Sequence, residues 1–460
     1  MRKTKQRIQI SDHFTFTKLL RFALPSIGMQ LVDNTYQIAD GYFISNFIGK
    51  DAFEAENLIF PPLLIVMYVG LMFGTGASAL ISKELGEGRQ ERAARVLSLA
   101  VSVLAAAGVL LSAALYFLLP SIARWVGAPE AMAPDCITYG RVLAFFMPFQ
   151  MLSMAFHPLM ITAGRPGLGL VATLSNAAAN ILLDGLFVAG FRWNLQGAAL
   201  ATGLAWLVSA VIPCVFFFNR KNFLHFTRPC ADLRALGRTM YNGASEMVTA
   251  VSYAVVTVIF NLQLLRWVGS DGVGAYAVSD YLAGVFIAVF YGLSMSVVPV
   301  VGYHLGQKDI AELRSLRKTG FTLMGALGLV AAGLCFGLAV PVSRLFVGYN
   351  QQLTDLSVQA LRIISLTYLV SGITTFASSY FTGLNQGTAS LAVAFAKGFA
   401  GPLVAVWLLP LALGATGIWL ANPAAEILAL LTMVPFLLHW IRRERRGDLP
   451  DPEEEDTARN

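Results

Sequence analysis

Charged side chains are scarce in this sequence. Asp, Glu, Lys and Arg make up 13% of its 460 residues, against roughly 25% in an average soluble protein. Three soluble domains of about 150 residues each would need far more charge to cover their surfaces. Apolar residues make up 56%. This composition excludes a soluble enzyme and a disordered chain, and it predicts an all-α membrane protein whose apolar surface faces lipid.

Metal-binding and nucleotide-binding patterns are also lacking. The cysteines are scattered and form no CxxC pair, which excludes a disulfide framework and a zinc site; they are Cys136, Cys214, Cys230 and Cys335. The five histidines form no HExxH motif, and no GxxxxGK[ST] loop is present, so ATP hydrolysis by the P-loop route is excluded. We expect neither an enzyme nor a cofactor.

Apolar runs of about 20 to 27 residues follow one another along the chain, and each can cross a hydrocarbon core of about 30 Å. The first 18 residues are polar and basic, so we predict no removable signal peptide. Twelve membrane-spanning helices are predicted, at residues 19–45, 58–82, 96–120, 139–163, 168–190, 197–218, 240–266, 273–300, 319–340, 360–382, 389–411 and 416–440.

Lys and Arg gather in alternate loops. One side of the membrane receives the basic groups within residues 2–7, 83–95, 220–238, 308–318 and 442–446, together with Arg165. The other side receives only Lys50, Arg124, Arg192, Arg266 and Arg344. The positive-inside rule makes the basic side cytoplasmic, with both termini there. Because the bases lie in short loops, the net charge of +6 predicts a lipid bilayer as partner and no nucleic acid. The acidic stretch Asp448–Asp456 is interpreted as a disordered tail.

The two halves of the chain resemble each other at one offset. Leu85-Gly86 returns as Leu305-Gly306, Arg124 as Arg344, and the run from Gly197 as that from Gly417, each 220 residues later. We therefore predict two six-helix bundles related by a pseudo-twofold axis along the membrane normal, around a central cavity that opens alternately to each side. The divisions are an N-terminal segment (1–18), two bundles (19–218 and 240–440), a cytoplasmic linker (219–239) and a tail (441–460). An internally duplicated fold of this kind can work as a monomer.

Six acids fall within predicted spans, where each costs about 2.5–3.5 kcal/mol at a helix centre if it faces lipid. They are expected to face a cavity or partners, and Lys397 is deep enough to pair with one of them. The acids are Asp33, Asp40, Asp184, Glu246, Asp280 and Glu426.

Asp40, Asp184 and Thr202 lie at one depth, about 8–9 Å below the outer surface at 1.5 Å per residue. Helical spacing aligns Asn180 with Asp184 on one face, and both lack acidic or amide counterparts in the second half. Such oxygen ligands suit Na⁺, and the carboxylates could carry H⁺ instead. The predicted cation-coupling set is Asp40, Asn180, Asp184 and Thr202. Possible substrate or proton sites are Asp33, Tyr36, Gln37, Asn176, Glu246, Asp280 and Glu426.

These features resemble the multidrug and toxic compound extrusion (MATE) transporters. The resemblance extends over about residues 15 to 440 and rests on Leu24-Pro25, Asp40-Gly41, the two Leu-Gly loop ends, Asn180-Ile-Leu-Leu-Asp184, Gly197-Ala-Ala-Leu-Ala-Thr202 and Gly417-Ile-Trp419. It implies a bacterial cytoplasmic-membrane protein that exports cationic, often aromatic, small molecules against inward Na⁺ or H⁺. It also implies that the four coupling residues occupy ion-site positions, and that the Gly243-Ala-Ser-Glu246 segment carries a second-half membrane glutamate.

The alternatives are a rival transporter and two proteins of other classes. A lipid or polysaccharide flippase of the same superfamily would often have more spans and a cationic cavity, whereas this chain has more acids than bases within its spans. Asn422-Pro423-Ala424 spells the triplet of water channels, but the repeat position is Thr202-Gly203-Leu204, so the required second triplet is lacking. An intramembrane enzyme is disfavoured because the sequence has no HExxH, GxGD or DDxxD motif.

Overall fold

The computed structural model describes residues 8–229 and 231–447. The basic residues 2–7, Cys230 and the acidic stretch Asp448–Asp456 lie outside the described residues. Within the two described ranges the chain is almost entirely helical and contains no strand. The predicted all-α membrane fold is therefore confirmed.

Twelve membrane-length helical segments are present in the described ranges. The first six are α1 (Phe16–Phe43) with the π-helical turn η1 (Ile44–Ile48), α2 (Lys50–Gly86), α3 (Gln90–Trp125), α4 (Ala133–Thr162), α5 (Pro166–Asp184) with η2 (Gly185–Gly190), and α6 (Asn194–Phe218). The second six are α7 (Leu233–Trp267), α8 (Ser270–Gly306), α9 (Ile310–Val347), α10 (Gln351–Gly383), α11 (Gly387–Phe395) continued by η3 (Ala396–Ala400) and α12 (Gly401–Leu413), and, after the short α13 (Ala415–Trp419), α14 (Ala421–Arg446).

Several helices start before the apolar run that predicted them. α2 begins at Lys50, whereas its apolar run begins at residue 58, because a helix need not end where the hydrocarbon core ends. Eleven helices are long and apolar enough to cross a membrane by composition alone. The exception is α1, which carries Lys18, Arg21, Asp33 and Asp40.

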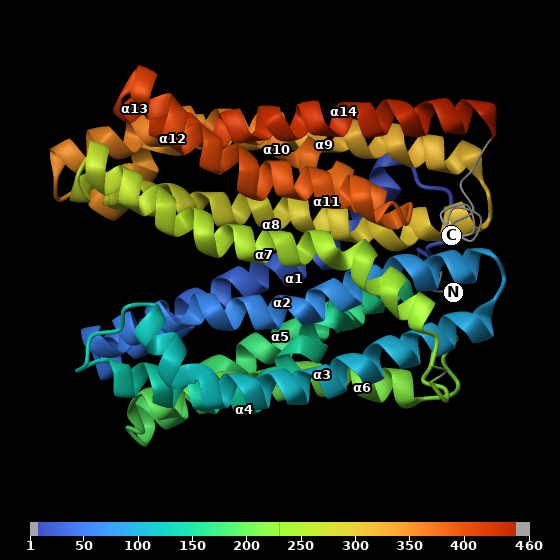
Figure 1. Cartoon of the computed structure of the whole chain (residues 1–460), viewed down its shortest axis with the longest axis horizontal. Helices are drawn as coiled ribbons and strands as arrows, with labels where there is room; N and C mark the ends of the chain where they lie inside the picture. Colours follow the sequence, from blue (N-terminus) through green and yellow to red (C-terminus); the bar gives the residue numbers. More distant parts are fainter. Residues whose placement is uncertain (1–7, 230, 448–460) are drawn as a thin grey trace, which may run out of the picture.

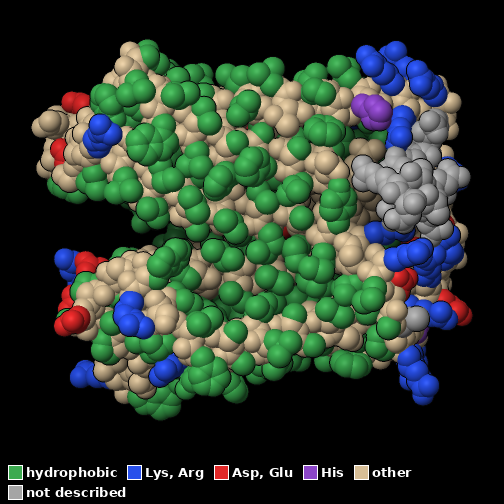
Figure 2. Space-filling view, in the orientation of Figure 1, with side chains coloured by type: hydrophobic (Ala, Val, Ile, Leu, Met, Phe, Trp, Pro, Cys, Tyr) green, Lys and Arg blue, Asp and Glu red, His purple; other side chains and the backbone are tan. Residues whose placement is uncertain are grey.

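The helices form two lobes (Figure 1). In the first lobe α4 packs against α2, α3 and α6, and α5 packs against α1 and α6; in the second, α10 packs against α8, α9 and α14. The lobes meet where α2 contacts α7 and α8, and where α1 contacts α8. Figure 2 shows a hollow between the lobes at the end opposite the termini, and Lys and Arg gathered at the end that carries the termini.

Glycines let the lobes approach at backbone distance. A Cβ at Gly76 would overlap the carbonyl oxygen of Thr239, and a Cβ at Gly243 would overlap that of Met72. The contact between α2 and α7 is therefore reciprocal, with one glycine on each helix seated against a carbonyl of the other. Small residues at helix interfaces allow this close packing in membranes.

The same arrangement recurs between α2 and α8. A Cβ at Gly86 would overlap the carbonyl oxygen of Tyr303, and a Cβ at Gly306 would overlap that of Lys83. These two glycines end the Leu-Gly pairs that revealed the repeat in the sequence. Their pairing across the lobe boundary explains why both halves have glycine there.

Replacing Gly243 by valine should force α2 and α7 apart. We expect a loss of stability of about 1–3 kcal/mol or more, as for overpacked cores, seen as a lower unfolding midpoint of the purified protein. Gly333→Val is the matched control, because a Cβ at Gly333 on α9 has no atom within 4 Å. Equal midpoints for the two variants would contradict the packing argument.

Candidate functional site

The four residues predicted to bind a cation come from three helices of the first lobe. Asp40 lies near the end of α1, Asn180 and Asp184 lie in the last turns of α5, and Thr202 lies in the third turn of α6. η1 begins four residues after Asp40, and η2 follows Asp184 directly. Such π-helical turns shift the register of a helix and occur often at functional sites.

Direct hydrogen bonds join three of these side chains. The Asn180 amide donates to Asp40 Oδ1 at 3.4 Å and to Thr202 Oγ1 at 3.1 Å, and Thr202 Oγ1 donates to Asp40 Oδ1 at 3.3 Å. Asp184 is fully buried, and its carboxyl group lies against that of Asp40. The structure thus brings all four residues together at the hollowed end of the first lobe.

Several oxygens in this cluster, and one that lies a helical turn away on α5, are buried without a hydrogen-bond partner among the described residues. They are both carboxylate oxygens of Asp184 and the amide oxygens of Asn180 and Asn176. Burying such atoms unpaired is costly, and the cost is far greater for a charged carboxylate. The cluster therefore requires a cation or protons to be stable.

Glu56 is a third carboxylate of the cluster, and the sequence analysis missed it. Its side chain contacts the Asp40 carboxyl group and accepts a hydrogen bond from the hydroxyl of Tyr139 at 3.3 Å. Its other oxygen is buried and has no partner in the described ranges. Glu56 precedes the apolar run of its helix by two residues, which placed it outside the predicted span. The signal that could have found it was its closeness to the start of the predicted span, at the side of the membrane where Asp40 also lies. In the structure Glu56 is six residues after Lys50, the first residue of α2.

The donor set fits a hard monovalent cation held by mixed oxygens. Among the described residues, no group of three or more His, Cys, Asp and Glu side chains is arranged to hold a metal ion by itself. A coordination shell here would need the amide oxygen of Asn180 and the hydroxyl of Thr202 together with the carboxylates, as oxygen-liganded ions accept. The carboxyl groups of Glu56 and Asp184 both lie against that of Asp40, so three negative charges there would repel one another. When no cation is bound, the three carboxyl groups must therefore share protons.

The other candidates in the first lobe lie apart from this cluster or beside it. Tyr36 and Asn176 are buried. Gln37 is exposed, so it does not share the buried face of Asp40. Asp33 lies 3.8 Å from Nδ1 of His157, measured from Asp33 Oδ2.

The acids of the second lobe have separate surroundings. Glu246 is buried and accepts a hydrogen bond from Tyr291 at 2.8 Å. Asp280 is exposed. Glu426 pairs with Lys397 at 3.1 Å, as the depth of that lysine predicted, and accepts a hydrogen bond from Thr374 at 2.6 Å.

Lys397 lies in η3, and hydrogen-bond acceptors surround its ammonium group. Its ammonium group donates to Thr375 at 2.6 Å and to the carbonyl and hydroxyl of Ser371 at 3.1 and 3.0 Å, besides pairing with Glu426. Both charges of the second-lobe pair are therefore compensated within the protein. The clustered carboxylates of Asp40, Glu56 and Asp184 have no ion pair with Lys or Arg described in the structure.

Replacing Lys397 by methionine should leave Glu426 buried without its counter-ion. We expect a loss of about 3 kcal/mol, the lower end for a broken buried pair, because a quarter of the Lys397 side chain is exposed. Unfolding midpoints of the purified variants measure it. The double variant Lys397→Met/Glu426→Gln should regain most of the loss; a double variant as unstable as the single one would contradict the pairing.

Comparisons with known proteins agree over nearly the whole chain. The MatE family pattern matches residues 25–186 and again 246–407, once in each lobe. The Multidrug export protein MepA of Staphylococcus aureus (strain NCTC 8325 / PS 47) is 23% identical over 446 residues, which span 96% of this chain and 97% of MepA. MepA of Staphylococcus saprophyticus is 22% identical over 451 residues, with the same shares.

Solved structures show the same fold. A crystal structure of MATE in complex with MaL6 superposes with a TM-score of 0.87 at 19% identity, over 94% of this chain and 98% of that one. An outward-facing multidrug resistance MATE family transporter of the MOP superfamily gives 0.88 at 19% identity, over 96% and 100%. At this level of identity the likeness concerns the arrangement of helices.

Proposed function

The chain belongs to the MatE family, the multidrug and toxic compound extrusion transporters, and on this basis we propose that it is a secondary active antiporter. It exports cationic or amphipathic organic compounds in exchange for Na⁺ or H⁺ by alternating access. As a member of a transporter family it is not an enzyme. The relatives named above are multidrug export proteins, which supports small organic molecules as its substrates.

The observation that carries this proposal is the group of unpartnered oxygens around Asp184 and Asp40. A set of buried carboxylates with no fixed counter-ion among the described residues is stable only when an ion or proton fills it. Because this site needs a bound ion or proton and lies at the hollowed end, ion binding there can change the arrangement of the helices in the first lobe. The second-lobe pair Lys397–Glu426 is already neutral and needs no ion.

In the proposed cycle the ion enters through the hollow and binds Asp40, Asn180, Asp184 and Thr202, with Glu56 beside them. Binding draws α1, α5 and α6 together, because the ligands lie on those helices, and so changes the hollow that holds substrate. Substrate leaves, the lobes rock, and the ion is released on the other side.

The energy of one coupled ion is sufficient for export. A charge that crosses about 100 mV releases roughly 2.3 kcal/mol, and a tenfold gradient adds about 1.4. Together these sustain roughly a 500-fold gradient of a neutral substrate. For a monovalent cation exchanged one for one the electrical part cancels, and about tenfold remains.

We further propose a bacterial cytoplasmic membrane location with both termini in the cytoplasm. The end that carries the termini is also the end where Lys and Arg gather (Figure 2), which is the pattern of a cytoplasmic face. The hollow then opens outward. A monomer suffices, because both lobes are in one chain.

Asp40→Asn/Asp184→Asn should lower ion-driven transport by at least tenfold, since two charged ligands are lost. Mutating even the residues that hydrogen-bond to metal ligands typically lowers metal affinity or activity about 10–100-fold. The measurement is uptake of a fluorescent cationic dye such as ethidium into inverted proteoliposomes. An imposed Na⁺ gradient at equal pH tests Na⁺, and a pH gradient without Na⁺ tests protons. The matched control is Asp51→Asn, an exposed acid at the same end. The proposal fails if neither gradient moves dye, or if the double variant transports like the control.

Glu56→Gln should weaken apparent affinity for the driving ion by about 10–100-fold, because the charge beside Asp40 is removed. The ion concentration that gives half-maximal dye transport measures this. Glu54→Gln is the control, since Glu54 is about half exposed and pairs with Lys50. An unchanged half-maximal concentration in Glu56→Gln would remove this residue from the site.

A further inference from the structure

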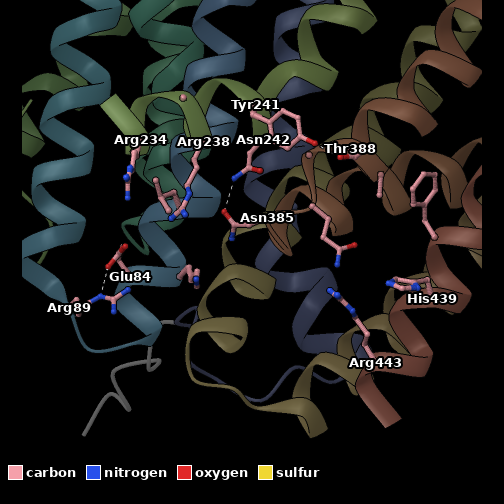
Figure 3. Close-up of a pocket in the computed structure, with 17 residues that line it drawn as sticks. Glu84, Arg89, Arg234, Arg238, Tyr241, Asn242, Asn385, Thr388, His439 and Arg443 are labelled. Atoms are coloured by element: carbon pink, nitrogen blue, oxygen red, sulfur yellow. Dashed lines mark hydrogen bonds and ion pairs between the residues drawn. The ribbon is translucent and has the colours of Figure 1, made fainter. Parts of the chain in front are cut away.

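The lobes converge at the end of the molecule that carries the termini, but their contact there is interrupted. A cavity of about 590 Å³ lies between them on one side of this end (Figure 3). Its walls are the end of α2 and the following Arg89 in the first lobe, and the starts of α7 and α11 and the last turns of α14 in the second. Because packing between the lobes is broken at the cavity, other contacts that join them at this end matter more.

We call residues 8–15, which precede α1, the strap. Asp12 of the strap pairs with Lys18 of α1 at 3.1 Å. Phe14 is fully buried, and its ring lies edge-on against that of Phe22 of α1, with the ring centroids 5.4 Å apart. The strap is therefore fixed to α1 and moves with this helix of the first lobe.

The strap binds Glu312, which lies in the first turn of α9 in the second lobe. The N–H of Phe14 donates to Glu312 Oε1 at 2.8 Å, and Nδ1 of His13 contacts Glu312 Oε2. The side chain of Glu312 is 6% exposed and that of His13 is 66% exposed. The strap thus supplies a partner to each oxygen of a buried carboxylate on the other lobe. Since a buried carboxylate without partners is costly, this contact stabilises the arrangement in which the two lobes meet.

The linker between the lobes is held in a related way. α3 begins at Gln90 and α9 begins at Ile310, 220 residues later, so they are equivalent helices of the two lobes. The side chain of Gln90 donates to the carbonyl oxygen of Phe223 at 2.7 Å, and the N–H of Thr227 donates to Ser98 Oγ at 2.8 Å. The segment that precedes the first helix of each lobe is therefore bound by the third helix of the other lobe.

These two attachments differ in how they can be released. The linker continues from α6, so the chain itself ties it to the first lobe, and its contact with α3 persists when the lobes move. The strap continues into α1 and reaches α9 through hydrogen bonds, which water can replace beside the exposed His13. The strap contact can therefore break while the linker stays in place.

We propose that the strap holds the lobes together at the end that carries the termini and leaves Glu312 when the lobes open at that end. The inference rests on the proposed alternating access and adds a contact that controls one of its two openings. It places the strap and the cation cluster at opposite ends of α1, since Asp40 lies near the other end of this helix.

The test uses the full chain in lipid nanodiscs, on a cysteine-free background, with nitroxide labels read by electron paramagnetic resonance. A label at Ser11→Cys, an exposed position of the strap, reports whether the strap is bound. A pair at Lys221→Cys in the linker and Lys318→Cys on α9, both exposed, reports the distance between the lobes. In Glu312→Ala we expect a mobile strap label and a ratio of separated to closed lobes that is raised about tenfold, because hydrogen bonds to a charged group are lost.

Glu91→Ala is the matched control, because Glu91 lies in the first turn of α3 and its side chain is 91% exposed. His13→Ala should shift both readings in the same direction as Glu312→Ala, and its exposed position keeps the test valid if Glu312→Ala does not fold. A strap label as mobile in the unchanged protein as in Glu312→Ala overturns the proposal. So does a released strap with unchanged lobe distances, or an equal shift in Glu91→Ala.

Dye transport by the unchanged chain separates this inference from the proposed antiport. If the unchanged chain transports dye and Glu312→Ala leaves the lobe distances as they were, the strap has no role and the antiport stands. If the unchanged chain transports no dye under either gradient and Glu312→Ala still separates the lobes, the antiport fails and the strap contact stands.

Discussion

Contact of bare backbone between the lobes is the constraint on which the rest of the structure depends. Between α2 and α7, Gly76 and Gly243 each lie against a backbone carbonyl of the opposite helix. Gly86 and Gly306 make the same contacts between α2 and α8. The lobes touch this closely on the side of the termini, and at the opposite end they stand apart around the hollow (Figure 2). The cation cluster lies at the end where the lobes stand apart, so it can respond to the angle between them.

The polarity of the two lobes differs in a way that the shared fold does not require. The first lobe gathers carboxyl groups around Asp40 without a counter-ion described in the structure, whereas the second encloses Lys397 with Glu426 and hydroxyl groups. Both lobes interrupt a helix with a π-helical turn near these charges. The carboxyl cluster of the first lobe thus has to be neutralised by an ion or by protons, whereas the Lys397–Glu426 pair of the second lobe is already neutral.

Much of this could be predicted from the sequence, for physical reasons. Helices rise by a fixed distance per residue, so counting from the span ends placed Asp40, Asp184 and Thr202 at one level, and the structure joins Asp40 to Asn180 and Thr202 by hydrogen bonds. Glu56 was not predicted as a site residue, because an apolar run marks where the hydrocarbon core begins and not where the helix begins. The cavity enclosed by the end of α2, the starts of α7 and α11 and the end of α14 was not predicted either, because packing alone brings these four distant segments together.

The reciprocal glycine contacts have a further consequence. A contact between side chains can loosen by degrees, as rotamers change one at a time. A contact between a glycine and a carbonyl has no rotamer to change, so at each of these glycines the two backbones either touch or separate. Separation would also admit water to the carbonyl groups of both helices at once. Glycine–carbonyl contacts of this kind between the lobes favour two discrete arrangements of the lobes over a continuum of intermediate angles.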